Sequence, residues 1–212
     1  MHVWRARLQR WFAPLAQRCP FSPNAISFFA MLLNAGAAVL FYFAAVDARL
    51  FLVAMVVVII AGLADAFDGI VARVQNKVSR YGDFLDHFFD RVSDLLLVAG
   101  WLIGSGVRVE LAMIAVIAVM LNGYIGTQVE ATWGERNYDS VGRGEFVLAL
   151  IVFPIVSFIL ATNGWNALHF ARLNIAEWMT LLLVAFAILG IAQRFGVASR
   201  LDNRLDKQTD RP

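Results

Sequence analysis

Residues 62–94 read GLADAFDGIVARVQNKVSRYGDFLDHFFDRVSD, and this stretch decides the fold because it places six carboxylates where two apolar segments meet. Asp65 and Asp68 are three residues apart and Asp86 and Asp90 are four apart, so on helices each pair shares one face. Two unit charges about 5.5 Å apart repel by roughly 3 kcal/mol at an effective dielectric of about 20. Four convergent carboxylates therefore need cations, and one or two divalent ions, which prefer oxygen ligands, would supply them.

The alternative is that these aspartates are ordinary interfacial residues. They would then pair with the basic residues of the same stretch, which are Arg73, Lys77, Arg80 and Arg91. An ionisable side chain at membrane depth is costly and usually faces the protein interior to serve a function. The clustering therefore favours a functional site.

The composition is that of a polytopic membrane protein. Of 212 residues, 60% are hydrophobic, and the mean hydropathy is +0.67, more than a soluble core of this size requires. A bilayer is crossed by about 20 apolar residues. Six such runs are Ile26–Val46, Leu50–Val71, Phe84–Gly104, Leu111–Glu130, Phe146–Ala161 and Ile175–Gln193. The sequence predicts an all-α polytopic membrane protein with six transmembrane helices and an N-terminal amphipathic interfacial helix.

The basic residues predict the orientation. Six spans put both termini on one side, and fifteen of the eighteen Lys and Arg residues fall there, against Arg49, Arg108 and Arg172 on the other side. By the positive-inside rule, the termini and the aspartates face the cytoplasm. We therefore expect an integral, multi-pass protein of the cell's inner membrane. A pI near 9.0 with this asymmetry favours contact with anionic lipid rather than nucleic acid.

We expect one catalytic domain with two flanking segments. In residues 1–20, Trp4 and Leu8 begin a helical apolar pattern between arginines, typical of a juxtamembrane helix in the interface or of a cytoplasmic cap. Residues 21–197 would form the six-helix transmembrane catalytic domain. Residues 198–212 are charged and would form a fraying cytoplasmic tail.

The acidic stretch also resembles a family signature. It reads Asp65-x-x-Asp68-Gly69-x-x-Ala72-Arg73, eight residues, then Gly82-x-x-x-Asp86-x-x-x-Asp90, and it matches every fixed position of the CDP-alcohol phosphotransferase family. The segment Pro23-Asn24-Ala25-Ile26-Ser27 is similar to the start of that family's first span. The predicted six-span topology agrees with the resemblance.

The resemblance implies a phospholipid-biosynthetic transferase. It would move a phosphatidyl-type or archaetidyl-type group from a CDP-linked lipid to the hydroxyl of a small polar alcohol and release CMP. Two divalent cations, Mg²⁺ or Mn²⁺, would be held by Asp65, Asp68, Asp86 and Asp90, and Asp90 would also be the catalytic base.

Further expectations come from the same resemblance. The CDP moiety would contact Asn24, Ala25, Ile26, Ser27, Gly69, Arg73 and Ser79. A homodimer packed through membrane helices is also implied, and the small residues Ala99, Gly100 and Gly104 offer it a close-contact surface.

Several residues have a physical reading of their own. Gly69 lets a phosphate or nucleotide approach the backbone, whereas Gly82 fits close helix packing equally well. Arg73 can fork onto a phosphate or pair with an acidic neighbour. We expect Asp83 and Asp94 to be outer-sphere or ion-pair groups and His87 to have a packing or interfacial role, and we assign nothing to Glu177.

The acceptor alcohol is less determined than the reaction. The segments Tyr124–Glu130 and Val141–Glu145 resemble those of inositol-phosphate-using members, which place Lys and Arg where this chain has Gly126 and Gln128. A phosphomonoester normally needs a basic cluster, and Arg136 and Arg143 are candidates for it. The resemblance implies an inositol phosphate-like acceptor, whereas the departure at Gly126 and Gln128 counts against it. The donor is expected to be either diacylglycerol-based or archaeol-based.

Two other function classes also place acids in membranes. Intramembrane prenyltransferases bind diphosphate through magnesium, but they split their aspartate motifs between distant helix pairs, whereas here one hairpin carries them all. A non-enzymatic divalent-cation transporter would explain the aspartates without any need for Gly69, Ala72 or Arg73. Stabilisation by CMP or CDP in the presence of a divalent cation separates the transferase from the transporter.

Overall fold

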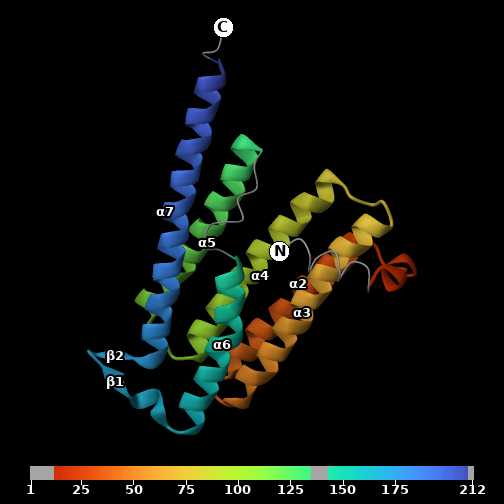
Figure 1. The fold of residues 1–212 in the computed structure, drawn as a ribbon. Coiled ribbons are helices and arrows are strands. Elements are labelled where there is room, and N and C mark those ends of the chain that lie inside the picture. The colour runs from red at the N-terminus through yellow and green to blue at the C-terminus, as the bar shows by residue number, and fades with distance from the viewer. Residues whose placement is uncertain (1–11, 135–142, 210–212) are drawn as a thin grey trace.

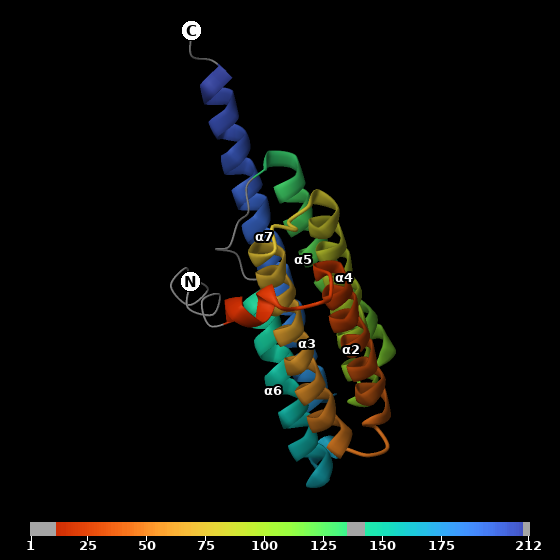
Figure 2. The same cartoon turned by 90° about the vertical axis from the view of Figure 1, so that its right-hand side faces the viewer.

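The fold is a bundle of long helices running between two ends of the molecule (Figures 1 and 2). The computed structural model describes residues 12–134 and 143–209. In chain order the elements are α2 (Pro23–Phe43), α3 (Arg49–Val74), α4 (Arg80–Gly104), α5 (Val109–Trp133), α6 (Arg143–Thr162), η1 (Trp165–Ala167), β1 (His169–Phe170), β2 (Leu173–Asn174) and α7 (Ile175–Thr209). We call the end where α3 passes to α4 the motif end. The predicted all-α class is confirmed, with a small antiparallel β1–β2 hairpin in addition.

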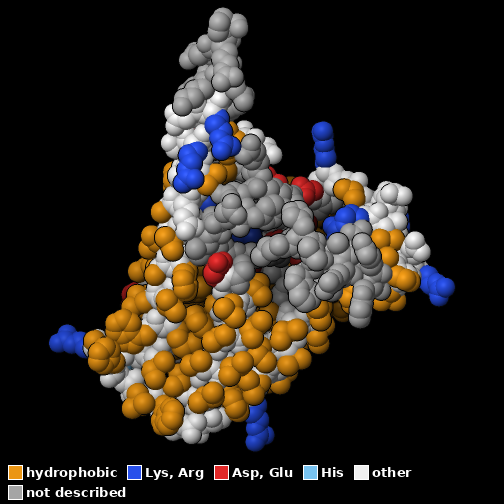
Figure 3. Space-filling view, in the orientation of Figure 1, with side chains coloured by type: hydrophobic (Ala, Val, Ile, Leu, Met, Phe, Trp, Pro, Cys, Tyr) orange, Lys and Arg blue, Asp and Glu red, His pale blue; other side chains and the backbone are white. Residues whose placement is uncertain are grey.

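Five of the described helices are long and apolar enough to cross a membrane, namely α2, α3, α5, α6 and α7. The sixth predicted span, α4, is not among these five, because its N-terminal half is too polar. This helix has 25 residues, but Arg80, Asp83, Asp86, Asp90, Arg91 and Asp94 all fall in its first half or just beyond. It still packs against α2 and α5 inside the bundle. Figure 3 shows the resulting surface, with hydrophobic side chains over the lower body and charged side chains gathered toward the motif end.

Two glycines set the close packing of α2 against α4. A Cβ at Gly100 would overlap the carbonyl oxygen of Ala38, and one at Gly104 would overlap that of Phe41. Both glycines are buried. The expectation that they form a surface for a second copy is therefore wrong, because the absence of their side chains is used within the chain to bring two backbones together.

The N-terminus of α7 at the opposite end accounts for Glu177, to which the sequence assigned no role. The Glu177 backbone N–H donates to Asn174 Oδ1 at 2.8 Å, and the Asn174 N–H donates to Glu177 Oε2 at 3.0 Å, which is a reciprocal capping box. Arg108 Nε donates to Glu177 Oε1 at 2.6 Å. With its side chain 3% exposed, the carboxylate is thus neutralised and joins α7 to the turn before α5.

The structure describes part of each of the two predicted flanking segments, residues 1–20 and 198–212. Residues 12–17 are helical, and Ala16 is fully buried against Ile70 and Val71. The rest of the predicted juxtamembrane helix, with Trp4 and Leu8, lies outside the described residues. Residues 198–209 of the predicted tail continue α7 as a helix, and residues 210–212 lie outside the described residues.

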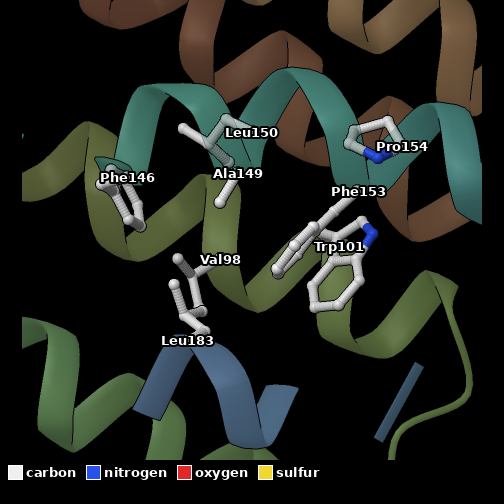
Figure 4. A pocket seen from close by; sticks show the side chains of 8 residues that line it. All are labelled: Val98, Trp101, Phe146, Ala149, Leu150, Phe153, Pro154 and Leu183. Atoms are coloured by element: carbon white, nitrogen blue, oxygen red, sulfur yellow. The ribbon is translucent and has the colours of Figure 1, made fainter. Parts of the chain in front are cut away.

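An apolar pocket lies between α4, α6 and α7 (Figure 4). It is lined by Val98, Trp101, Phe146, Ala149, Leu150, Phe153, Pro154 and Leu183. The Trp101 indole N–H donates to Ser157 Oγ at 3.1 Å, which satisfies the one polar group of that ring. Because this lining is entirely apolar, we interpret the pocket as a small gap in the packing of the helices beside Pro154 and not as a binding site for a polar substrate.

Candidate active site

Three aspartates converge at the motif end of the bundle. One carboxylate oxygen from each of Asp65, Asp68 and Asp86 lies within 4.8 Å of the other two, and we call these three residues the carboxylate cluster. Asp65 and Asp68 share one face near the end of α3, and Asp86 faces them from the second turn of α4. Asp68 is buried, with 7% of its surface exposed, and the other two are half-buried. The predicted convergence is thereby observed for three of the four residues.

The cluster has the chemistry of a divalent-cation site. At 4.8 Å, the largest separation in the cluster, a pair of unit charges repels by about 3.5 kcal/mol at an effective dielectric of about 20. Oxygen-only ligands suit Mg²⁺ and Mn²⁺. The donor set therefore fits the divalent cation that the sequence predicts.

Asp90 is outside this cluster. It lies one turn further along α4 and is half-buried. Its predicted roles as a ligand and as the base stay predictions.

Ser27 joins α2 to the cluster. Its hydroxyl lies within hydrogen-bond reach of Asp68 Oδ2 and, at 3.1 Å, of the Pro23 carbonyl oxygen. A hydroxyl has one proton, and the anionic carboxylate is the stronger acceptor. Ser27 therefore orients Asp68, and its predicted contact with CDP stays a prediction.

The first turns of α2 and α4 meet at Gly82. A Cβ on Gly82 would lie 3.2 Å from Asn24 Oδ1 and 3.1 Å from Ser79 Oγ. The Gly82 N–H donates to Ser79 Oγ at 3.0 Å, so Ser79 is the N-cap of α4. Ser22 caps α2 in the same way, accepting from the Ala25 N–H at 3.2 Å. Gly82 thus serves the close approach of two helix N-termini.

Arg73 lies over the backbone of Gly69. A Cβ there would come within 3.4 Å of Arg73 Nη1, and the Arg73 side chain is exposed. A guanidinium placed one turn from the carboxylate cluster can bind a phosphate by donating hydrogen bonds to it beside the bare backbone of Gly69. Of the other predicted CDP contacts, Ala25 is exposed, and Ile26 packs on the apolar group that contains Ala16 and Ile70.

Two arginines that the motif does not contain meet on one face of α5. The Arg91 guanidinium occupies the space that a Cβ on Gly123 would take, and the Arg194 guanidinium lies against Gly126. Arg194 also donates to Asn122 Oδ1. Arg91 pairs with Asp94 at 3.1 Å, which confirms Asp94 as an ion-pair group. The Gly123-x-x-Gly126 spacing, one helical turn, is the sequence signal that could have indicated this face.

His87 connects α4 to α5. Its Nε2 lies 3.7 Å from Glu130 Oε2, and its Nδ1 lies 2.8 Å from the Asp83 carbonyl oxygen. These contacts fit the packing role expected for it.

Comparisons with known proteins agree with this site. The profile of the CDP-alcohol phosphatidyltransferase family matches residues 21–189. An archaetidylinositol phosphate synthase of Aeropyrum pernix is 30% identical over 90% of this chain and 95% of its own length. One of Pyrococcus horikoshii is 27% identical over 54% of this chain and 64% of its own length. The matches to this and two other curated relatives thus each span less than two thirds of the relative.

Solved structures show the same fold. The phosphatidylinositol phosphate synthase of Mycobacterium tuberculosis with CDP-DAG bound has a TM-score of 0.68 at 20% identity, covering 89% of this chain and 94% of that one. Its complex with manganese and citrate has a TM-score of 0.67 at 22% identity, covering 88% of each chain. Since the family profile covers well over half of the sequence, the chain belongs to the CDP-alcohol phosphatidyltransferase family.

Proposed function

We propose that this protein transfers a lipid-bearing phosphoryl group from a CDP-linked lipid to the hydroxyl of a small polar alcohol, with release of CMP. The observation that carries the proposal is the convergence of Asp65, Asp68 and Asp86 beside Gly69 and Arg73. A cation transporter would use the carboxylates but has no need of an arginine laid over a bare backbone. A prenyltransferase would draw its aspartates from separate helix pairs.

The proposed reaction is a single displacement at phosphorus. The acceptor oxygen forms a bond to the phosphorus that bears the lipid, the anhydride bond to CMP breaks, and the hydroxyl proton passes to the Asp90 carboxylate. Two Mg²⁺ or Mn²⁺ ions at the four motif aspartates would neutralise charge on the diphosphate. Arg73 binds a phosphate of the donor over Gly69, and Asn24, Ala25, Ile26 and Ser79 border the nucleotide. Ser27 holds Asp68 in place.

The acceptor we propose is a phosphorylated polyol such as an inositol phosphate. Support comes from the printed names of the archaetidylinositol phosphate synthase relatives. The inositol-phosphate users have a basic residue where this chain has Gly126, and here the Arg194 guanidinium from α7 lies against that glycine. Together with Arg91 over Gly123, it offers the positive charge that a phosphomonoester needs.

The membrane setting is also part of the proposal. We place the motif end and both termini on the cytoplasmic side, because Arg49, Arg108 and Arg172 lie toward the opposite end, whereas Arg73, Lys77 and Arg80 lie at the motif end. A homodimer is proposed on the family resemblance, through a surface other than Gly100 and Gly104. A monomeric mass in both mild detergent and nanodiscs would contradict the dimer.

The decisive experiment is an acceptor screen with purified protein. CDP-diacylglycerol and CDP-archaeol are each offered with inositol phosphate, glycerol phosphate or free inositol, with Mg²⁺, Mn²⁺ or EDTA, and CMP release is measured. We expect cation-dependent release that is fastest with a phosphorylated acceptor. Absence of release with every pair, together with no thermal stabilisation by CDP and Mn²⁺, would refute the transferase.

A further inference from the structure

Gln75, the residue that caps the C-terminal end of α3, bonds through its side-chain nitrogen to a distant segment of the chain. Gln75 Nε2 donates to the carbonyl oxygens of Ala16, at 2.9 Å, and Cys19, at 3.0 Å. Gln75 Oε1 accepts from Lys77 Nζ at 2.7 Å. One glutamine therefore ties the chain that precedes α2 to the residue that ends α3, and Figure 2 shows the short N-terminal helix lying beside α3.

An apolar contact supports these hydrogen bonds. Fully buried Ala16 packs with Ile70 and Val71, and the rings of Phe12 and Phe67 meet edge-on at 6.3 Å. By helical periodicity Phe67, Ile70 and Val71 lie on the face of α3 away from Asp65. The N-terminal segment thus braces the motif end of α3 from behind.

The link from this brace to the active site is short. Only residues 20–22 separate Cys19 from the start of α2, and Pro20 and Pro23 restrict the backbone there. The first turn of α2 then carries Asn24, beside Gly82, and Ser27, bonded to Asp68. A shift of the link would therefore move two site residues together.

We propose that Gln75 is a positioning residue, which clamps the link before α2 and thereby holds Asn24 beside Gly82 and Ser27 at the carboxylate cluster. The clamp sets donor binding rather than the chemical step, because it positions Asn24, which borders the nucleotide in the proposed function, and leaves the proposed base Asp90 on another helix. This consequence for the donor rests on the proposed function.

The test compares Gln75→Glu with Gln17→Glu. The first keeps the side-chain size but replaces both N–H donors by a carboxylate facing two carbonyl oxygens, and the second makes the same change at an exposed glutamine of the same segment. We expect Gln75→Glu to raise the KM for the CDP-linked donor about tenfold, equivalent to about 1.4 kcal/mol, with kcat within about threefold. Gln17→Glu should change neither constant.

Cys19 is the only cysteine and gives a readout that does not need catalysis. Its rate of maleimide labelling should rise several-fold in Gln75→Glu and stay unchanged in Gln17→Glu. Gln75→Leu serves as the second variant if Gln75→Glu fails to fold.

A raised labelling rate with an unchanged donor KM, a loss of kcat alone, or no change in either readout would each overturn the positioning role. If wild-type protein releases no CMP from any donor, the proposed function fails and the labelling rate alone decides whether the clamp exists.

Discussion

Replacing Asp68 by Asn should stabilise the cation-free protein while removing most of its response to divalent cations. Asp68 takes part in two of the three pairings of the carboxylate cluster, and it is the most buried member. Asn keeps the shape and an oxygen that can accept from the Ser27 hydroxyl, but it removes the negative charge. The same change therefore relieves repulsion without a cation and weakens the site for one.

The magnitude follows from the geometry. A pair of unit charges 4.8 Å apart repels by about 3.5 kcal/mol at an effective dielectric of about 20, so relieving two pairs removes about 7 kcal/mol of repulsion before solvent is considered. Solvent around the half-buried partners and a weaker hydrogen bond from Ser27 reduce this gain, and we expect about 1–2 kcal/mol. For a chain of this length, that raises Tm by about 2–8 °C in EDTA.

The assay is thermal unfolding in detergent with EDTA or with Mn²⁺. Cation at a hundred times its Kd should add about 2.7 kcal/mol to the wild type and less than half of that to Asp68→Asn. Asp202→Asn is the matched control, since Asp202 is exposed on α7, and it should match the wild type in both conditions. A lower Tm in EDTA combined with a wild-type response to Mn²⁺ would refute the reasoning.

Three further predictions concern turnover, packing and the acceptor. Asp90→Asn should lower kcat about 10²–10⁴-fold while nucleotide affinity measured by calorimetry with Mn²⁺ largely survives, and normal CMP release would disprove the base assignment. Gly104→Ala should cost about 1–3 kcal/mol in thermal unfolding, because its Cβ would meet the Phe41 carbonyl, whereas Gly62→Ala, with open space around it, should be neutral or slightly stabilising. Arg194→Gln should raise the KM for a phosphorylated acceptor at least tenfold but leave the donor KM unchanged; an equal rise for both would contradict an acceptor-specific role.

Much of the helical framework could be predicted from local sequence. Apolar runs of spanning length located the helices to within a few residues, except that α7 continues well past Gln193 to Thr209, and the spacing of Asp65, Asp68 and Asp86 predicted carboxylates that face one another. The signature around them predicted the family that the profile match then showed. Composition alone does not identify α4 as a sixth apolar span, because the aspartates that make the site also make the first half of that helix too polar.

What the sequence determined by itself depends on helix periodicity, which relates residues three or four apart whatever surrounds them. That rule places Asp65 with Asp68 and Arg73 over Gly69. Contacts between helices depend on how each one rotates and slides to pack its ridges and small residues against a neighbour, and no local spacing encodes this. Tertiary structure alone therefore decided that Gly100 and Gly104 receive α2 rather than a second copy. It also brought Ser27 to Asp68, Arg194 to Gly126 and Gln75 to Ala16, pairs that lie 41 to 68 residues apart in the chain.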